Sequence, residues 1–142
     1  MTAAPEILGG MGDPEITTTS RIEDAWNRGD LDEMLADTPP DAEWVVAEEN
    51  PDARTLRGPA EIRAYLEDWR STVYGLRFEP TERHDAGDAV VTVGTISGRA
   101  GSEDGPEVTV PLAIVTRFEN SHVVRTEEYL DVTRAFAAAG LS

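Results

Sequence analysis

The chain has 142 residues, a length typical of one domain with a single hydrophobic core. Its 28 acidic and 12 basic residues, the latter all arginine, give a formal net charge of −16, which disfavours nucleic acid and anionic membranes as partners. The absence of cysteine excludes disulfides, thiolate catalysis and zinc–thiolate sites. No apolar run approaches the roughly 18–20 residues that span a bilayer, and the N-terminus lacks the basic start of a secretory signal. We therefore expect a cytoplasmic protein.

The first predicted element is a helix after a loose start. Residues 1–12 contain three glycines and a proline, which predicts a flexible tail. Asp13-Pro14 offers an N-cap followed by proline at the first helical position, so we expect a helix over residues 13–28. Three threonines in that stretch are weak helix formers. An alternative start is Ser20, with Glu23 completing a capping box.

Two further helices are predicted in the N-terminal half. Gly29 ends the first helix, and Asp30 caps a short second one over residues 31–36. After a proline turn, residues 42–47 predict a short strand, and residues 48–57 have no periodicity and indicate a loop. The next helix is expected over residues 59–73, with Gly75 as the residue that stops it. Its apolar residues recur at helical spacing and form one stripe, made of Ile62, Tyr65, Leu66, Trp69 and Val73.

The C-terminal half is dominated by strands. β-branched and alternating residues separated by glycine-rich turns predict four antiparallel strands, at 76–83, 89–99, 107–118 and 122–131. Pro111 within the third strand implies a bulge or a locally unpaired position. A final short helix is expected over residues 132–139, where Asp131 is the expected N-cap.

This order of elements predicts an α+β fold in one domain, residues 13–142. Three N-terminal helices followed by a long antiparallel sheet favour a layout in which the helices pack on one face of the sheet. A sheet that curves around helices encloses a conical hollow, which the inward-facing side chains would line.

The last two strands carry the most informative residues of that hollow. Alternation places four residues of each strand on the inward face: Leu112, Ile114, Thr116 and Phe118 on the first, and Val124, Thr126, Glu128 and Leu130 on the second. Glu128 is the one acid among apolar and threonine side chains. If the strand were shifted by one residue, Glu127 would point inward instead.

At this point the chain resembles a known family. The segments AWNRGDLDEMLA, RGPAEIRAYLEDW, HDAGDAVVTVGTISGR and TRFENSHVVRTEEYLD resemble the SnoaL-like branch of the nuclear transport factor 2-like superfamily. That superfamily includes ketosteroid isomerases, polyketide cyclases and limonene-type epoxide hydrolases. The resemblance covers roughly residues 14–140 and implies a cone-like fold. It does not fix the reaction, because function depends on the site rather than the fold.

The catalytic groups of ketosteroid isomerases are missing at the matching positions. Their helix tyrosine falls on Ile22, their base near Val45 or Val46, and their second acid on Ile114. Steroid isomerisation by that mechanism is therefore not expected.

Two other branches each keep one matching acid. The resemblance to SnoaL-type cyclases implies that Glu128 is a general base, while the histidine beside it falls on Ile114. In limonene-type epoxide hydrolases one acid also falls on Glu128, and the arginine and other acid fall near Gly94 and Ile96.

The candidate site residues follow from these faces. A carboxyl in an apolar hollow has a raised pKa and can transfer a proton, which makes Glu128 the catalytic candidate. The aromatic residues are expected to be core first. Alternatively, some of them line the cavity mouth, with Trp44 or Tyr65 able to offer a polar tip to a ligand. The candidate ligand-binding residues are Trp26, Trp44, Tyr65, Trp69, Phe78, Ile96, Leu112, Ile114, Thr126 and Leu130.

Other polar residues are assigned surface roles. His84 and His122 sit at turns without a second ligand at metal spacing, so neither a metal nor another cofactor is expected. Arg57 precedes the third helix and is expected to face solvent rather than bind an anion.

Three functions remain open at this stage. The first is a cofactor-free acid–base enzyme, an isomerase, cyclase or dehydratase, that acts on a hydrophobic oxygenated substrate such as a polyketide or terpenoid. The second is a non-catalytic ligand-binding or dimerisation module, and the third an epoxide hydrolase. The resemblance also implies a homodimer through the outer sheet face, which would carry Val115, Arg117, Val123, Arg125 and Tyr129.

Overall fold

The computed structural model describes residues 12–51 and 53–141. The tail predicted at residues 1–12 lies outside the described residues, apart from Gly12, which begins the first helix. The helices are α2 (Gly12–Arg28), α3 (Leu31–Met34), α4 (Pro59–Thr72) and α5 (Val132–Ala138).

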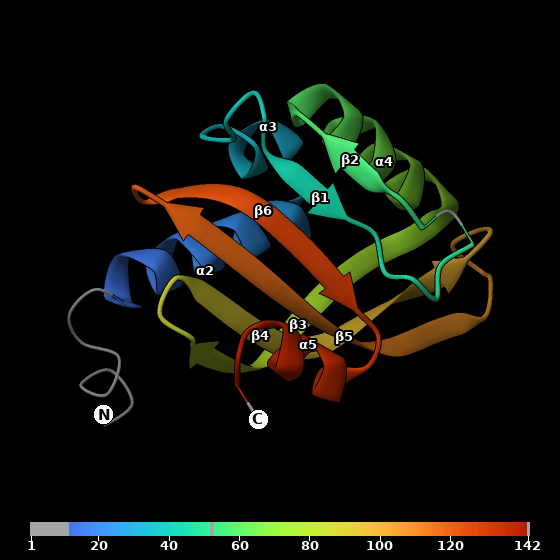
Figure 1. The fold of residues 1–142 in the computed structure, drawn as a ribbon. Helices are drawn as coiled ribbons and strands as arrows, with labels where there is room; N and C mark the ends of the chain where they lie inside the picture. The colour runs from blue at the N-terminus through green and yellow to red at the C-terminus, as the bar shows by residue number, and fades with distance from the viewer. Residues whose placement is uncertain (1–11, 52, 142) are drawn as a thin grey trace.

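The strands form one six-stranded sheet in the order β2-β1-β6-β5-β4-β3 (Figure 1). Only the β1–β6 pair is parallel among the described strands, and the other pairs are antiparallel. Their bounds are β1 (Glu43–Val45), β2 (Thr55–Arg57), β3 (Val73–Asp85), β4 (Ala89–Ala100), β5 (Glu107–Glu119) and β6 (His122–Tyr129).

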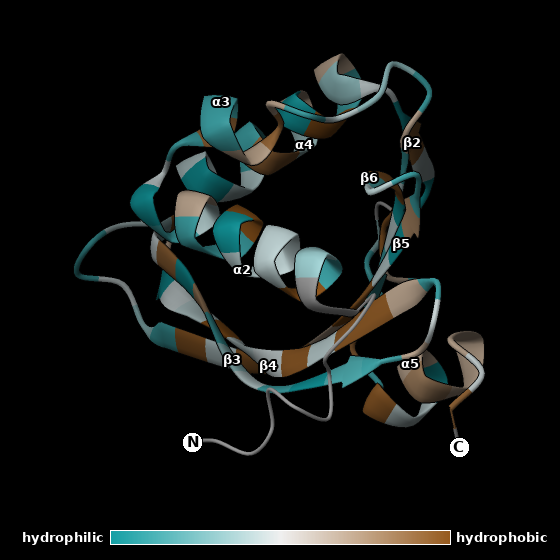
Figure 2. Ribbon diagram, turned by 90° about the vertical axis from the view of Figure 1, so that its left-hand side faces the viewer, coloured by the Kyte–Doolittle hydropathy of each residue, from teal (hydrophilic) through white to brown (hydrophobic). Residues whose placement is uncertain are grey.

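The sheet curves around the N-terminal helices. Figure 2 shows α2, α3 and α4 on the concave side of the sheet and α5 against its outer, convex side. The predicted α+β cone, with three N-terminal helices in the hollow of a mostly antiparallel sheet, is thus confirmed. Each side has its own buried cluster: the larger one lies in the hollow, and the smaller one packs α5 against β4 and β5 through Ala135, Val91 and Val115.

The helices largely follow their predicted signals. Because α2 already begins at Gly12, the alternative start at Ser20 is wrong. The Asp30 carboxylate accepts a hydrogen bond from the Glu33 amide, and that of Asp131 from the Thr133 amide, so both are N-caps as predicted. α4 ends at Thr72, one residue before the predicted end, and the chain continues directly as β3, so Gly75 is not the residue that stops the helix.

The sheet holds one strand that the sequence did not predict and one bulge that shifts a face. β2 lies within the predicted loop, with only Leu56 of its three residues buried. Between β5 and β6 the register moves from Arg117–Arg125 to Phe118–Val123, which leaves Val124 as the extra residue. Val123 therefore lies opposite the inward-facing Phe118, and the prediction that Val123 belongs to the outer face is wrong.

Pro111 lies where β5 is unpaired on one side, and Gly94 lies where the neighbouring strand leaves no room for a side chain. Pro111 pairs with Thr95 on β4, and the β5–β6 pairing begins only at Ala113, so Pro111 is unpaired on its β6 side. Gly94 lies against β3, where a Cβ atom would come within 2.2 Å of the Glu79 carbonyl oxygen. This close approach coincides with the β3 bulge between Pro80 and Glu82.

No helix among the residues that the structure describes is long and apolar enough to cross a membrane.

Candidate functional site

A cavity of about 420 Å³ lies between the concave face of the sheet and helices α2 and α4. Its volume falls within the range of small-molecule sites. Glu128 and every residue that the sequence predicted to contact a ligand line this cavity: Trp26, Trp44, Tyr65, Trp69, Phe78, Ile96, Leu112, Ile114, Thr126 and Leu130. Contact with a ligand remains a prediction for all of them.

The aromatic residues of the wall are not equally buried. Trp26, Tyr65 and Phe78 are both core and cavity wall. Trp69 is 38% exposed and Leu130 is 36% exposed, so Trp69 is not the core residue that its helical spacing predicted. Because these two side chains touch both the cavity and solvent, they mark its mouth.

Glu128 points into the hollow from β6 and is held there by three donors. The Trp44 indole Nε1 donates to its carboxylate at 2.7 Å, and the Ala47 amide donates at 3.3 Å. The Tyr65 hydroxyl lies 3.0 Å from both carboxylate oxygens. The polar tips of Trp44 and Tyr65, which the sequence offered to a ligand, are therefore directed at Glu128.

Burial sets the protonation chemistry of this group. Desolvation raises the pKa of Glu128, and the hydrogen bonds from Trp44, Tyr65 and Ala47 oppose that rise without cancelling it. Desolvation and the neighbouring Glu128 charge also raise the pKa of Tyr65, so its phenol stays protonated at neutral pH. The arrangement thus pairs one carboxyl able to exchange a proton with three fixed donors.

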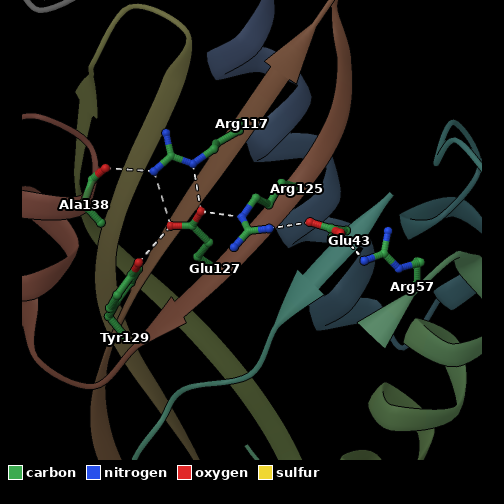
Figure 3. Close-up of polar contacts among 7 residues, drawn as sticks. All are labelled: Glu43, Arg57, Arg117, Arg125, Glu127, Tyr129 and Ala138. Carbon is green, nitrogen blue, oxygen red and sulfur yellow. Dashed lines mark hydrogen bonds and ion pairs between the residues drawn. The ribbon is translucent and has the colours of Figure 1, made fainter. Parts of the chain in front are cut away.

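The neighbouring acid, Glu127, faces the opposite side of the sheet, so the alternative register is wrong. Figure 3 shows its carboxylate among the side chains of Arg117, Arg125 and Tyr129. Arg117 Nε donates to it at 2.8 Å, Arg125 Nε at 2.7 Å and the Tyr129 hydroxyl at 2.8 Å. Although burial raises the pKa of Glu127, the hydrogen bonds from both arginines and Tyr129, together with the Arg117 charge, outweigh burial and hold that pKa below its usual value. Glu127 is therefore ionised at neutral pH on the convex face.

Three of the positions compared with relatives lie in the hollow. Ile22, Ile96 and Ile114 line the cavity, so apolar side chains stand where ketosteroid isomerases and epoxide hydrolases keep polar ones. Ile114 is the direct cross-strand neighbour of Glu128. Within β5 and β6 the carboxyl therefore has no polar partner at that position.

The sequence did not identify a second buried acid in the cavity wall. Glu23 was considered only as a helix cap, yet its side chain lines the cavity and is 7% exposed. It forms an ion pair with Arg83 of β3. Desolvation raises the pKa of Glu23 to about 7, although the Arg83 charge and the nearby Thr92 hydroxyl oppose that shift. Its position on the inward face of α2, one residue after Ile22, was the only available signal.

The remaining polar candidates have structural partners elsewhere. His84 contacts Glu82 and packs edge-on against Phe136 of α5, and Arg57 pairs with Glu43 at 2.8 Å while remaining largely exposed. His122 lies exposed at the β5–β6 turn. Among residues 12–51 and 53–141, no group of three or more histidine and acidic side chains is placed to hold a metal ion.

Comparisons with known proteins agree with this geometry. Residues 20–126 match the model of the SnoaL-like domain family. A nuclear transport factor 2-like protein of unknown function from Burkholderia pseudomallei K96243 is 25% identical, with a TM-score of 0.74, over 87% of this chain and 95% of that one. One from Burkholderia thailandensis E264 is 29% identical, with a TM-score of 0.74, over 91% and 98%.

A third similar structure contains a bound small molecule. TerC, co-crystallised with polyporic acid, is 26% identical to this chain, with a TM-score of 0.72, over 89% of this chain and 97% of that one. No curated protein sequence matches the chain. The family match spans most of the described domain, and the chain belongs to the SnoaL-like family of the nuclear transport factor 2-like superfamily.

Proposed function

We propose that the protein is a cofactor-free acid–base enzyme that acts on a hydrophobic, oxygenated small molecule, with Glu128 as the proton-transfer group. The reaction would be an isomerisation, cyclisation or dehydration, in which Glu128 removes a proton from carbon beside a carbonyl and returns it elsewhere. Trp44 and Tyr65 would hold the carboxylate in one orientation.

One observation carries this proposal: a carboxyl with a raised pKa forms part of the wall of a mostly apolar cavity. A general base works best when its pKa lies near the working pH, and burial is the usual means of raising a glutamate to that range. Apolar walls select a hydrophobic body for the substrate. The complex of TerC with polyporic acid supports a substrate of aromatic, oxygenated chemistry.

A second candidate function is binding without catalysis. Both carboxylate oxygens of Glu128 already accept hydrogen bonds from the chain. A carboxylate used only to fix the cavity wall would be bonded in the same way.

Deuterium exchange separates these two functions. We expect the protein in D2O to accelerate exchange of the α-protons of 2-tetralone, a bicyclic ketone, as followed by NMR. Replacing Glu128 by glutamine keeps the shape but removes the base, and should lower the exchange rate at least about 100-fold.

The matched control is Glu127→Gln, which changes the adjacent buried acid on the opposite face. This variant should exchange 2-tetralone at the wild-type rate. Binding of 2-tetralone without accelerated exchange in the wild-type protein would favour the second candidate. Exchange that persists in Glu128→Gln would remove Glu128 from the mechanism.

We also propose a homodimer through the convex face, the assembly implied by the family. The part of that face outside α5 carries the ion-pair series of Glu127, Arg125, Glu43 and Arg57. These four side chains pair within one chain, and each chain carries a formal net charge of −16, so salt should screen the repulsion between two copies. We expect sedimentation equilibrium to show a dimer that strengthens as the salt concentration rises. A monomer at every salt concentration would contradict this assembly.

A further inference from the structure

Four residues lie in one register row across the concave face of the sheet. Arg83 of β3 pairs with Thr92 of β4, Thr92 with Ile114 of β5, and Ile114 with Glu128 of β6. Adjacent strands are about 4.8 Å apart, so the backbones at Thr92 and Glu128 are separated by about 10 Å. The row has polar groups at its two ends and an isoleucine between them.

Helix α2 adds a carboxylate to the end of the row that lies away from Glu128. Glu23 forms an ion pair with Arg83 and lines the same cavity as Glu128 and Ile114. The contacts of Glu128 come from β1 and α4, whereas those of Glu23 come from β3 and β4. The two carboxyls therefore belong to opposite sides of the hollow.

A purely structural ion pair that ties α2 to the sheet is the simplest alternative. In such a pair, all buried polar atoms are normally hydrogen-bonded. Here Arg83 Nε is buried and has no hydrogen-bond partner among the described residues. Glu23 itself has ligand-sized space in front of it. The Glu23–Arg83 pair is thus arranged to hold the Glu23 carboxylate at the cavity wall rather than to fill the core.

We propose that Glu23, positioned by Arg83, is a second polar binding group of the cavity, which accepts a hydrogen bond from a hydroxyl of a substrate held against Glu128. The substrate class follows from the row. It has a compact apolar body that packs on Ile114 and oxygen functions at both ends. This inference rests on the proposed function, because it uses the same cavity with Glu128 at the other end.

The test measures binding of two rigid probes by calorimetry. 2-Naphthol carries one hydroxyl, and 2,6-dihydroxynaphthalene carries a second at its far end. A hydrogen bond to a charged acceptor contributes about 1.5–3 kcal/mol, so the second hydroxyl should strengthen wild-type binding at pH 8 about tenfold or more. Glu23→Gln should abolish most of that gain while binding 2-naphthol as the wild type does.

Two further variants make the result specific. Glu127→Gln removes an equally buried, arginine-paired carboxylate from the convex face. It therefore controls for any general loss of stability caused by removing such a carboxylate. This variant should keep the full gain in affinity from the second hydroxyl. Should Glu23→Gln not fold, Glu23→Asp keeps the charge next to Arg83 but withdraws the carboxylate from the cavity. Glu23→Asp should then lose most of the affinity gained from the second hydroxyl.

The outcomes distinguish this inference from the proposed function. An undiminished preference for the dihydroxy probe in Glu23→Gln, or in Glu23→Asp, overturns the role of Glu23, whatever 2-tetralone exchange shows. Equal affinity of the wild type for the two probes overturns it as well. Conversely, loss of the preference in Glu23→Gln together with unchanged exchange in Glu128→Gln would leave a two-ended binding site whose base is not Glu128.

Discussion

The free energy of unfolding is expected to decrease as the pH rises from about 4.5 to 7, and Glu23 should account for about 3 kcal/mol of that decrease. Folding raises the pKa of Glu23 from 4.5 to about 7. Between these values the folded protein retains a proton that the unfolded chain has already released. The stabilisation is therefore complete below pH 4.5, falls through this interval and stays constant above it. Burial of Glu128 acts in the same direction.

Urea unfolding of three variants at several pH values checks this expectation. Glu23→Gln and Glu128→Gln should each flatten the decrease, because glutamine does not titrate. Glu127 has the opposite sign: its folded pKa is lowered, so its contribution is present at neutral pH and is lost as the pH falls through that lowered value. Glu127→Gln should therefore leave the decrease unchanged. A wild-type stability that rises between pH 4.5 and 7 would show that Glu23 is not held as described.

Replacing Gly94 by alanine is expected to cost about 3 kcal/mol or more of unfolding free energy. The added Cβ would lie 2.2 Å from the Glu79 carbonyl oxygen and 2.8 Å from the Pro80 Cα. Both are backbone atoms, so a side-chain rotation cannot relieve the overlap. β3 would have to separate from β4 at the bulge next to Arg83, which should also disturb the Glu23 side of the cavity.

The control is Gly101→Ala in the β4–β5 turn. Gly101 has a positive φ of 83° and nothing within 4 Å of an added Cβ, so alanine there meets only the left-handed backbone penalty of about 1–2 kcal/mol. Thermal unfolding of both variants checks the difference. Similar losses of stability in the two variants would mean that β3 and β4 shift to accommodate the added Cβ atom at Gly94.

Alternation along β6 was sufficient to separate the two adjacent acids. Because strand side chains point to opposite faces in turn, Thr126, Glu128 and Leu130 were correctly placed inward. The same rule failed at Val123, because one extra residue at Val124 reverses the alternation beyond it. Nothing in the local composition distinguishes Val124 as a bulge, since two consecutive valines fit either arrangement.

Residues whose role depends on distant partners were the ones that the sequence could not assign. Glu23 satisfied a local capping pattern with Ser20, whereas its actual partner, Arg83, lies 60 positions away. β2 was missed because three residues with one buried side chain carry no periodicity. Trp44 and Tyr65 were correctly placed at the cavity. The hydrogen bond of Trp44 to Glu128 depends on the parallel pairing of β1 with β6, which no local signal reveals.

That parallel pairing has a consequence for the order in which the molecule folds. β1 pairs with a strand about 80 positions later in the chain, and contacts of such large sequence separation form slowly. A nascent chain that ends before β6 lacks Glu128 and cannot form its bond to Trp44. The cavity therefore lacks one wall until β6 docks, and the bond between Trp44 and Glu128 can form only then.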